Sequence, residues 1–166
     1  MATITLRGQP IHTGGNLPHI HATAPDFQLV NSDLEVRSLK DFHGRRKLFN
    51  IFPSIDTPVC ALSTRKFNEH ARSHPETVFL MVSADLPFAQ KRFCGLEGLA
   101  NVVTLSMMRD RDFARDWGVL IIDGPLAGLA ARAVVVVDEA DRVVYHELVP
   151  EIGQEPDYLR ALGALG

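Results

Sequence analysis

The sequence predicts a three-layer α/β/α sandwich built around a mixed β-sheet. Two segments, KLFNIF at 47–52 and VFLMVS at 78–83, are apolar on both faces, and a segment with helical character follows each of them. Strands of this kind belong to sheets that are covered on both sides. A closing hairpin around 138–141 adds an antiparallel pair of strands, which makes the predicted sheet mixed.

The N-terminal half of the chain ends in a helix whose start is well marked. Thr57 is a favourable N-cap residue, Pro58 suits the first helical position, and Pro75 stops the helix. Asp56 is an alternative cap and would move the boundary by one residue. The elements predicted for this half are a hairpin (4–6 and 11–12, around Gly8-Gln9-Pro10), a strand opened by Ala24-Pro25 (about 27–30), the buried strand 47–52 and the helix from 57 to about 74.

The C-terminal half continues the alternation of strands and helices. Gly95 is predicted to end the helix that contains Cys94, because glycine commonly follows the last helical residue. The elements predicted here are a strand at 78–83, a helix at 87–94, a strand at 102–105, a helix at about 110–117, strands at 133–137 and 142–148, and a last helix after Pro156 through 165.

Length and composition restrict the class of protein. The chain has 166 residues, enough for one domain, and we expect residues 1–166 to form a single domain. Its apolar fraction of 46% and charged fraction of 22% are typical of a soluble globular protein. A net charge of −3 and the lack of a basic cluster argue against binding to nucleic acid or to a membrane surface. The N-terminus lacks the pattern of a secretory signal, so we expect a cytoplasmic protein.

The two cysteines are the main candidates for chemistry. Cys60 and Cys94 lie 34 residues apart, so the C-x-x-C pattern of a dithiol oxidoreductase is absent. In a reducing compartment, a pair of thiols is more often catalytic, redox-active or simply buried than a permanent disulfide.

Cys60 falls in the first turn of the predicted helix. Backbone N–H groups are unpaired there and the helix dipole is positive, which favours the nucleophilic thiolate. Cys60 also shares a helix face with Phe67 and Ala71, so its sulfur should point toward the protein. The spacing alone leaves open a second interpretation, in which Cys60 is a small buried residue that packs like alanine.

Several motifs identify a resemblance to a known family. The pattern Pro-x-x-x-Thr-x-x-Cys, formed by Pro53, Thr57 and Cys60, resembles the active-site signature of the peroxiredoxins. The wider sequence is similar to the bacterial thiol peroxidases, a two-cysteine branch of that family, almost from end to end. The matching segments are NIFPSIDTPVCALSTRKFN at 50–68, SADLPFAQKRFCG at 83–95, GLAARAVVVVDE at 128–139 and EPDY at 155–158.

The resemblance implies a thioredoxin-like fold and a role for each site residue. Cys60 would attack a peroxide oxygen and become a sulfenic acid. The Thr57 hydroxyl would bond the thiolate and the substrate oxygen, and Pro53 would shield the site from water. Arg132 would place its guanidinium beside the sulfur, favouring the thiolate and stabilising charge on the leaving oxygen. Cys94 would resolve the sulfenic acid as an intramolecular Cys60–Cys94 disulfide.

Helix geometry adds an expectation about Cys94. Cys60 is near the start of its helix, whereas Cys94 is about seven residues into the next, a difference in depth of about 10 Å at ~1.5 Å per residue. A disulfide needs Cα atoms roughly 4.4–6.8 Å apart. We therefore expect the helix around Cys94 to unwind during oxidation, with residues near 88–98 changing more than the sheet.

The resemblance also implies the reactants and partners. The substrates would be hydrogen peroxide and organic hydroperoxides, thioredoxin would recycle the enzyme in antioxidant defence, and the chain would form a homodimer. Apolar walls formed partly by Phe52, Phe88 and Phe93 would favour alkyl hydroperoxides. No nucleotide-binding loop, flavin motif or haem motif occurs, so no cofactor is expected. His70 and His74 have the spacing of metal ligands but no evident third ligand, and we expect no metal site.

Two other functions use the same residues. In a redox-sensing binding module, the disulfide would alter a surface for a partner and turnover would be incidental. A dithiol–disulfide oxidoreductase is a third interpretation, which the wide spacing of the cysteines disfavours. Thr57, Pro53 and Arg132 favour the peroxidase.

Overall fold

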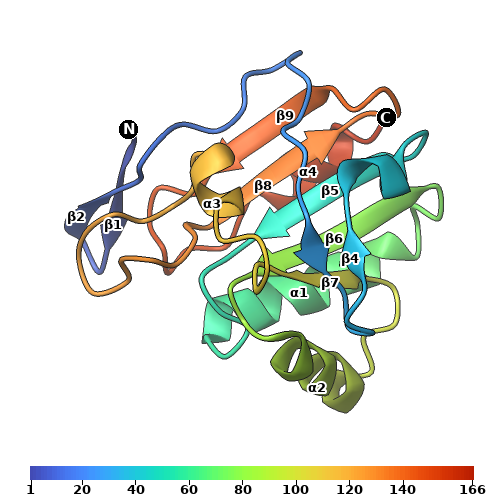
Figure 1. Cartoon of the computed structure of the whole chain (residues 1–166), viewed down its shortest axis with the longest axis horizontal. Coiled ribbons are helices and arrows are strands. Elements are labelled where there is room, and N and C mark those ends of the chain that lie inside the picture. The colour runs from blue at the N-terminus through green and yellow to red at the C-terminus, as the bar shows by residue number, and fades with distance from the viewer.

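A seven-stranded mixed sheet forms the centre of the computed structural model, which describes residues 1–166 (Figure 1). The strands lie in the order β4-β3-β7-β6-β5-β8-β9, with parallel pairs β5–β6 and β6–β7 and antiparallel pairs elsewhere. The predicted mixed sheet is therefore confirmed. The strands are β3 (Leu29–Val30), β4 (Val36–Arg37), β5 (Arg46–Ile51), β6 (Thr77–Ser83), β7 (Val103–Ser106), β8 (Ala133–Val137) and β9 (Val143–Leu148).

Each face of the sheet carries its own apolar cluster because successive strand residues point to opposite faces. Leu48 of β5 belongs to the cluster under the helices α1 (Pro58–Ala71) and α4 (Tyr158–Gly163), and the helix α2 (Pro87–Glu97) packs Phe93 against it. Phe49 belongs to the larger cluster on the other face, where α3 (Phe113–Asp116) and the N-terminal segments lie. There the single tryptophan, Trp117, is fully buried, and its ring centroid lies 4.7 Å from that of Phe49.

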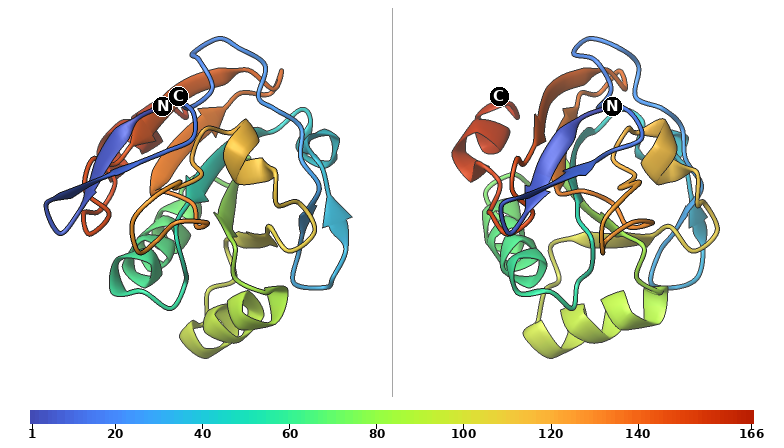
Figure 2. Two further views of the ribbon diagram at one scale, coloured as in Figure 1. Left: turned by 60° about the vertical axis from the view of Figure 1, so that its left-hand side comes forward. Right: turned by 90° about the vertical axis from the view of Figure 1, so that its left-hand side faces the viewer.

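The N-terminal hairpin lies outside the central sheet. Its strands, β1 (Thr3–Leu6) and β2 (Gln9–His12), form a separate two-stranded sheet, and the turn between them places Arg7 and Gly8 at φ values of 51° and 79°. Consecutive left-handed residues are typical of the tightest hairpin turns. Figure 2 shows the hairpin beside the loop that follows β9, where Thr5 forms an isolated bridge with Glu151.

One helix boundary near Cys94 was predicted wrongly. The helix α2 continues through Gly95 to Glu97, and Gly98 ends it with a φ of 66°. The N–H groups of Gly98 and Leu99 both donate to the Cys94 carbonyl. A glycine with positive φ satisfies the last helix carbonyls without a steric penalty, so Gly98 rather than Gly95 is the stop signal.

Other helices are shorter than predicted. α1 ends at Ala71 instead of about His74, because residues 72–74 form a turn in which the Ser73 and His74 amides donate back to His70 and Ala71. The helix expected at 110–117 is only the single turn of α3, and α4 starts after Asp157, which caps it through a bond from the Arg160 N–H. The strand β4 and a 3₁₀ turn at Leu39–Phe42 were not predicted. None of the helices combines the length and the apolar character needed to cross a membrane.

A buried ion pair secures the end of β5 that lies away from Cys60. Lys47 is fully buried and donates to the Asp141 carboxylate, whose second oxygen lies 2.8 Å from His43 Nδ1. Burial acts to raise the pKa of Asp141, but the bonds from Lys47 and His43 outweigh it and hold that pKa below its ordinary value. The pair therefore adds stability at neutral pH that is lost as the pH falls through the folded-state pKa of Asp141.

Asp141→Asn is expected to lower the free energy of unfolding at pH 7 by about 3 kcal/mol, because it leaves the Lys47 charge buried without a counter-charge. Asparagine tolerates the positive φ of 64° at this position, so the backbone adds little to the loss. Urea denaturation measures the effect. The control Glu139→Gln removes an exposed partner of Arg46 and should cost less than about 1 kcal/mol. Equal losses for both variants would contradict the importance of the buried pair.

Candidate active site

Cys60 lies in the first turn of α1, as predicted, and its side chain is fully buried. Thr57 occupies the N-cap position with extended backbone, and Pro58 is the first helical residue, so the alternative boundary at Asp56 is wrong. The Thr57 hydroxyl does not bond the sulfur in this structure. It donates to the Ser54 carbonyl at 2.8 Å, which leaves its lone pairs available as acceptors.

Arg132 brings a permanent positive charge to the sulfur. Its Nη2 lies 3.3 Å from Cys60 Sγ, and its Nε donates to the Ile152 carbonyl at 2.9 Å. The guanidinium is buried, with 1% of the residue exposed, and its Nη1 has no hydrogen-bond partner. A guanidinium stays charged at any physiological pH, so this contact favours an anionic sulfur even though the sulfur is buried. The free Nη1 is a donor that a ligand oxygen can satisfy.

A small cavity of about 270 Å³ adjoins this contact. Pro53, Thr57 and Arg132 all line it, so three of the predicted site residues meet in one place. The rest of the lining is largely apolar and comes from the hairpin, the start of α1 and two loops: Leu6, Arg7, Pro58, Val59, Leu126, Leu129, Ile152 and Gly153.

The aromatic walls predicted for the cavity are wrong. Phe52 is fully buried under α1, Phe88 is 63% exposed on α2, and Phe93 packs against the cluster beneath α1. None of the three lines the cavity, which is walled by aliphatic residues such as Leu126 and Ile152 instead. The prediction failed because it rested on proximity in sequence, and the cavity walls come from distant segments.

Asp85 anchors the loop that leads into α1, and sequence reasoning missed it. Its carboxylate accepts the Ser54 hydroxyl at 2.7 Å and the Ile55 N–H at 2.7 Å, from the loop before Cys60. It also accepts the Ser83 hydroxyl at 2.6 Å. Asp85 thus ties the Cys60 loop to the connection between β6 and α2. The available signal was an acidic residue placed just after a buried strand.

A second polar cluster lies near Arg132. The Glu155 carboxylate accepts bonds from Lys66 Nζ at 2.8 Å and from the Tyr158 hydroxyl at 2.9 Å. The bond with Lys66 is the largest effect that lowers the pKa of Glu155, and the charge of Arg132 adds a smaller one. Glu155 therefore adds negative charge near the Arg132 guanidinium. The EPDY segment pointed to this region only through the resemblance.

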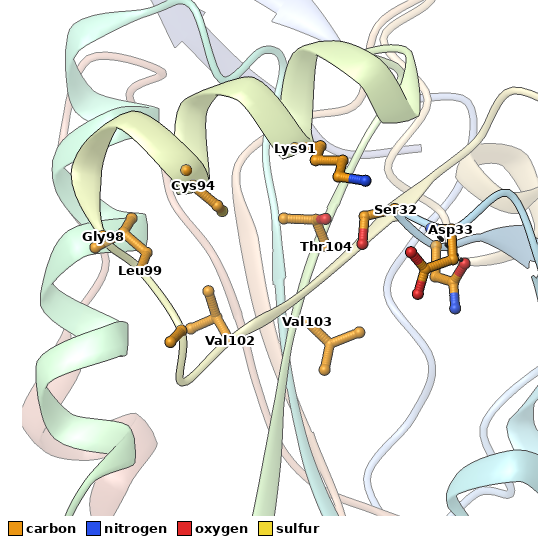
Figure 3. Close-up of a pocket in the computed structure, with 12 residues that line it drawn as sticks. Ser32, Asp33, Lys91, Cys94, Gly98, Leu99, Val102, Val103 and Thr104 are labelled. Atoms are coloured by element: carbon orange, nitrogen blue, oxygen red, sulfur yellow. Dashed lines mark hydrogen bonds between the residues drawn. The ribbon is translucent and has the colours of Figure 1, made fainter.

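Cys94 occupies a different environment on α2. It is partly buried, its thiol is free like that of Cys60, and it lines a cavity of about 580 Å³ between α2 and β7 (Figure 3). Burial raises the pKa of the Cys94 thiol to about 11. In this conformation Cys94 is protonated and a poor nucleophile.

Contacts with α1 hold α2 in place. Arg65 forms two hydrogen bonds with Glu97, at 2.9 and 3.1 Å, and Asn68 Oδ1 accepts the Asn101 N–H at 2.8 Å. His70 lies in α1 and His74 lies beyond the end of that helix, and no cluster of three or more potential metal ligands occurs in the structure.

The fold and the site define the class of protein. A mixed thioredoxin-like sheet that presents a buried thiol against a guanidinium, beside a small cavity, is the arrangement of a thiol-dependent oxidoreductase. The family model described as Redoxin matches residues 21–162. Along all 166 residues the chain is 57% identical to the thiol peroxidases of Mycobacterium bovis and Mycobacterium tuberculosis, and the match covers 99% of each relative. The chain therefore belongs to the thiol peroxidases of the Redoxin family.

Solved structures agree with this assignment. A peroxiredoxin-like protein from Aquifex aeolicus is 38% identical and superposes with a TM-score of 0.94, covering 99% of this chain and 96% of that one. A thiol peroxidase from Chromobacterium violaceum is 26% identical with a TM-score of 0.91, covering 98% and 94%. The protein is thus a peroxiredoxin-type, thiol-dependent peroxidase with a thioredoxin-like fold.

Alkylation of Cys94 is expected to be slow in the folded protein. A pKa raised from an ordinary 9.0 to about 11 reduces the thiolate fraction at pH 7 by a factor of roughly 100. Iodoacetamide labelling of Cys60→Ser, followed by mass spectrometry in buffer and in urea, measures the ratio. Similar rates in the two conditions would show that Cys94 is not protected by burial.

Proposed function

We propose that the protein reduces hydrogen peroxide and organic hydroperoxides through a Cys60 sulfenic acid, which Cys94 of the same chain resolves and thioredoxin recycles. The observation that carries the proposal is the 3.3 Å contact between Cys60 Sγ and Arg132 Nη2 beside a cavity large enough for a small ligand. We treat residues 1–166 as one domain that performs both steps.

In the first step, the Cys60 thiolate attacks one oxygen of the O–O bond. The sulfur gains that oxygen as a sulfenic acid and loses two electrons, while the other oxygen leaves as hydroxide or alkoxide and takes up a proton. The unpartnered Arg132 Nη1 supports a role in stabilising the charge on the leaving oxygen. Thr57 Oγ1, an acceptor on the cavity wall, suits the hydroperoxide O–H, and the buried Pro53 excludes water.

The walls of the cavity support organic hydroperoxides as substrates. Leu6, Leu126, Leu129 and Ile152 line the space next to Arg132 and can contact an alkyl group without leaving polar atoms unpaired. Hydrogen peroxide needs only the polar end of the site. These aliphatic residues thus form the apolar walls that were predicted to come from Phe52, Phe88 and Phe93.

In the second step, the Cys94 thiolate attacks the Cys60 sulfenic sulfur. The S–S bond forms, and the sulfenic oxygen leaves as hydroxide, which becomes water. The dithiol of thioredoxin then reduces the disulfide to two thiols and is itself oxidised. Cys94 is partly buried with a raised pKa, so the helix α2 must open before this attack.

The composition of α2 supports local opening. Only two of its residues, Pro87 and Gln90, are buried, and Phe88 and Leu96 are 63% and 81% exposed. Gly95 in the helix interior lowers helix stability by about 1 kcal/mol relative to alanine. Segments with few buried contacts open most readily.

Variants of the two cysteines test the order of steps. Cys60→Ser should abolish peroxide consumption, because no other sulfur contacts a cation. Cys94→Ser should allow one fast oxidation per chain but no cycling with a thioredoxin system. Steady-state NADPH consumption and mass spectrometry after one equivalent of peroxide measure both. Normal cycling by Cys94→Ser would disprove its assigned role, and a single stoichiometric oxidation of the wild type would favour a redox sensor.

Hydrogen exchange tests the opening of α2. Residues 88–98 should exchange faster in the oxidised protein than in the reduced protein, whereas β5 and β6 should change little. Mass spectrometry of peptides from both redox forms gives the comparison. Equal protection of 88–98 in the two forms would contradict the unwinding.

The proposal extends to a homodimer, as the family resemblance implies, and to a location in the cytoplasm, as expected from the sequence. Light scattering of the reduced protein distinguishes a dimer from a monomer, and fractionation of cells that express the protein tests its location.

A further inference from the structure

We infer that Glu151 is a positioning residue for the peroxidase site: its carboxylate holds the hairpin turn against residues 150–153 and so fixes the Ile152 carbonyl that orients Arg132. The inference rests on the proposed roles of Cys60 and Arg132.

The orientation of the Arg132 guanidinium depends on one oxygen atom. Its side chain forms two hydrogen bonds, from Nη2 to the Cys60 sulfur and from Nε to the Ile152 carbonyl. Of these two partners, the sulfur reacts, and only the Ile152 carbonyl takes no part in the reaction. Because a guanidinium is planar, a fixed Nε–H also fixes the direction of both terminal nitrogens. The position of the Ile152 carbonyl therefore determines where Nη1 and Nη2 point.

The segment that carries this carbonyl belongs to no strand of the central sheet. It follows β9 as a loop and is held by the hairpin instead: the Thr5 N–H donates to the Pro150 carbonyl at 2.8 Å, and the Ile152 N–H donates to the Thr5 carbonyl at 2.9 Å. Loops held by few contacts move more easily than sheet strands.

The Glu151 carboxylate connects the hairpin to the loop that follows β9. It accepts the Thr5 hydroxyl, the Arg7 N–H at 3.0 Å and the Gly8 N–H at 3.2 Å from the hairpin, and the Gly153 N–H at 3.3 Å from its own loop. Arg7 and Gly8 both have positive φ, so their adjacent N–H groups converge on one anion. These bonds, with that of Thr5 the largest effect, lower the pKa of Glu151 to about 2, so the carboxylate is ionised at neutral pH.

The hydrogen bonds of Glu151 also affect the shape of the cavity. Leu6 and Arg7 line it from the hairpin, and Ile152 and Gly153 line it from the loop. Loss of the carboxylate therefore affects both the direction of Arg132 and the aliphatic wall. Hydrogen peroxide has no alkyl group to contact that wall, so its rate of reaction reports on Arg132 alone.

The structure offers a matched control in Asp123. Its carboxylate fastens the other end of the hairpin, accepting the His12 N–H at 2.7 Å and lying 2.6 Å from His12 Nδ1. Asp123 forms no hydrogen bond with residues 150–153 and does not line the cavity beside Arg132. Asp123→Ala removes contacts that hold the hairpin but keeps the hydrogen bonds that hold the Ile152 carbonyl.

The experiment measures the second-order rate of Cys60 oxidation by hydrogen peroxide, using rapid quench and mass spectrometry on the full-length protein. Glu151→Ala should slow oxidation roughly 10- to 100-fold, because a displaced guanidinium no longer meets the sulfur and the leaving oxygen. The rate of Cys60 alkylation by iodoacetamide at pH 7 should also fall in this variant, because the sulfur loses its contact with the guanidinium. Asp123→Ala should stay within about twofold of wild type, the expectation for a change away from the reacting groups.

Glu151→Gln keeps one acceptor oxygen and the size of the side chain, and it should give an intermediate rate; circular dichroism confirms which variants are folded. If Glu151→Ala does not fold, a wild-type rate for Glu151→Gln overturns the inference. A wild-type rate for folded Glu151→Ala, or an equal loss in Asp123→Ala, also overturns it. Arg132→Ala and Cys60→Ser test the proposed function separately. If these two variants react with peroxide at the normal rate, the proposed function fails. If they are inactive while the Glu151 variants react normally, only the inference about Glu151 fails.

Discussion

The contact between the Cys60 sulfur and the Arg132 guanidinium determines how the surrounding segments must be arranged. A buried cation without an anionic partner is strongly unfavourable, and here the nearest group able to carry the compensating charge is the sulfur itself. The guanidinium therefore offers the sulfur a favourable electrostatic partner inside the protein. The first turn of α1 adds unpaired backbone N–H groups on the other side of the same atom. The surrounding loops hold the sulfur and the guanidinium in contact.

The two thiols have the same chemistry, but their surroundings give them different roles. Cys60 is the more deeply buried, yet the Arg132 guanidinium contacts it, whereas Cys94 is only partly buried and forms no hydrogen bond with a cation. The guanidinium, and not the depth of burial, is thus what distinguishes the two positions. Asp85 connects them structurally, since its carboxylate ties the Cys60 loop to the connection that starts α2.

Local sequence signals predicted much of this site but not all of it. The Thr57–Pro58 pair located the start of α1, and with it the place of Cys60, because capping depends on adjacent residues. The approach of Arg132 to Cys60 came only from family resemblance, since 72 positions separate the two residues and no local pattern joins them. Gly95 was mistaken for the stop signal of Gly98, because composition does not reveal which glycine adopts a positive φ. Asp85 and Glu151 escaped notice because their partners are hydroxyls and backbone N–H groups of other segments, which no sequence pattern marks.

The placement of the only tryptophan gives the protein a built-in optical probe. Trp117 packs on Phe49 and Phe113, on the face of the sheet opposite to the cluster that contains Cys60. Unfolding of this layer exposes the indole ring to water, so the emission of Trp117 follows the melting of the side of the sheet that lies away from Cys60.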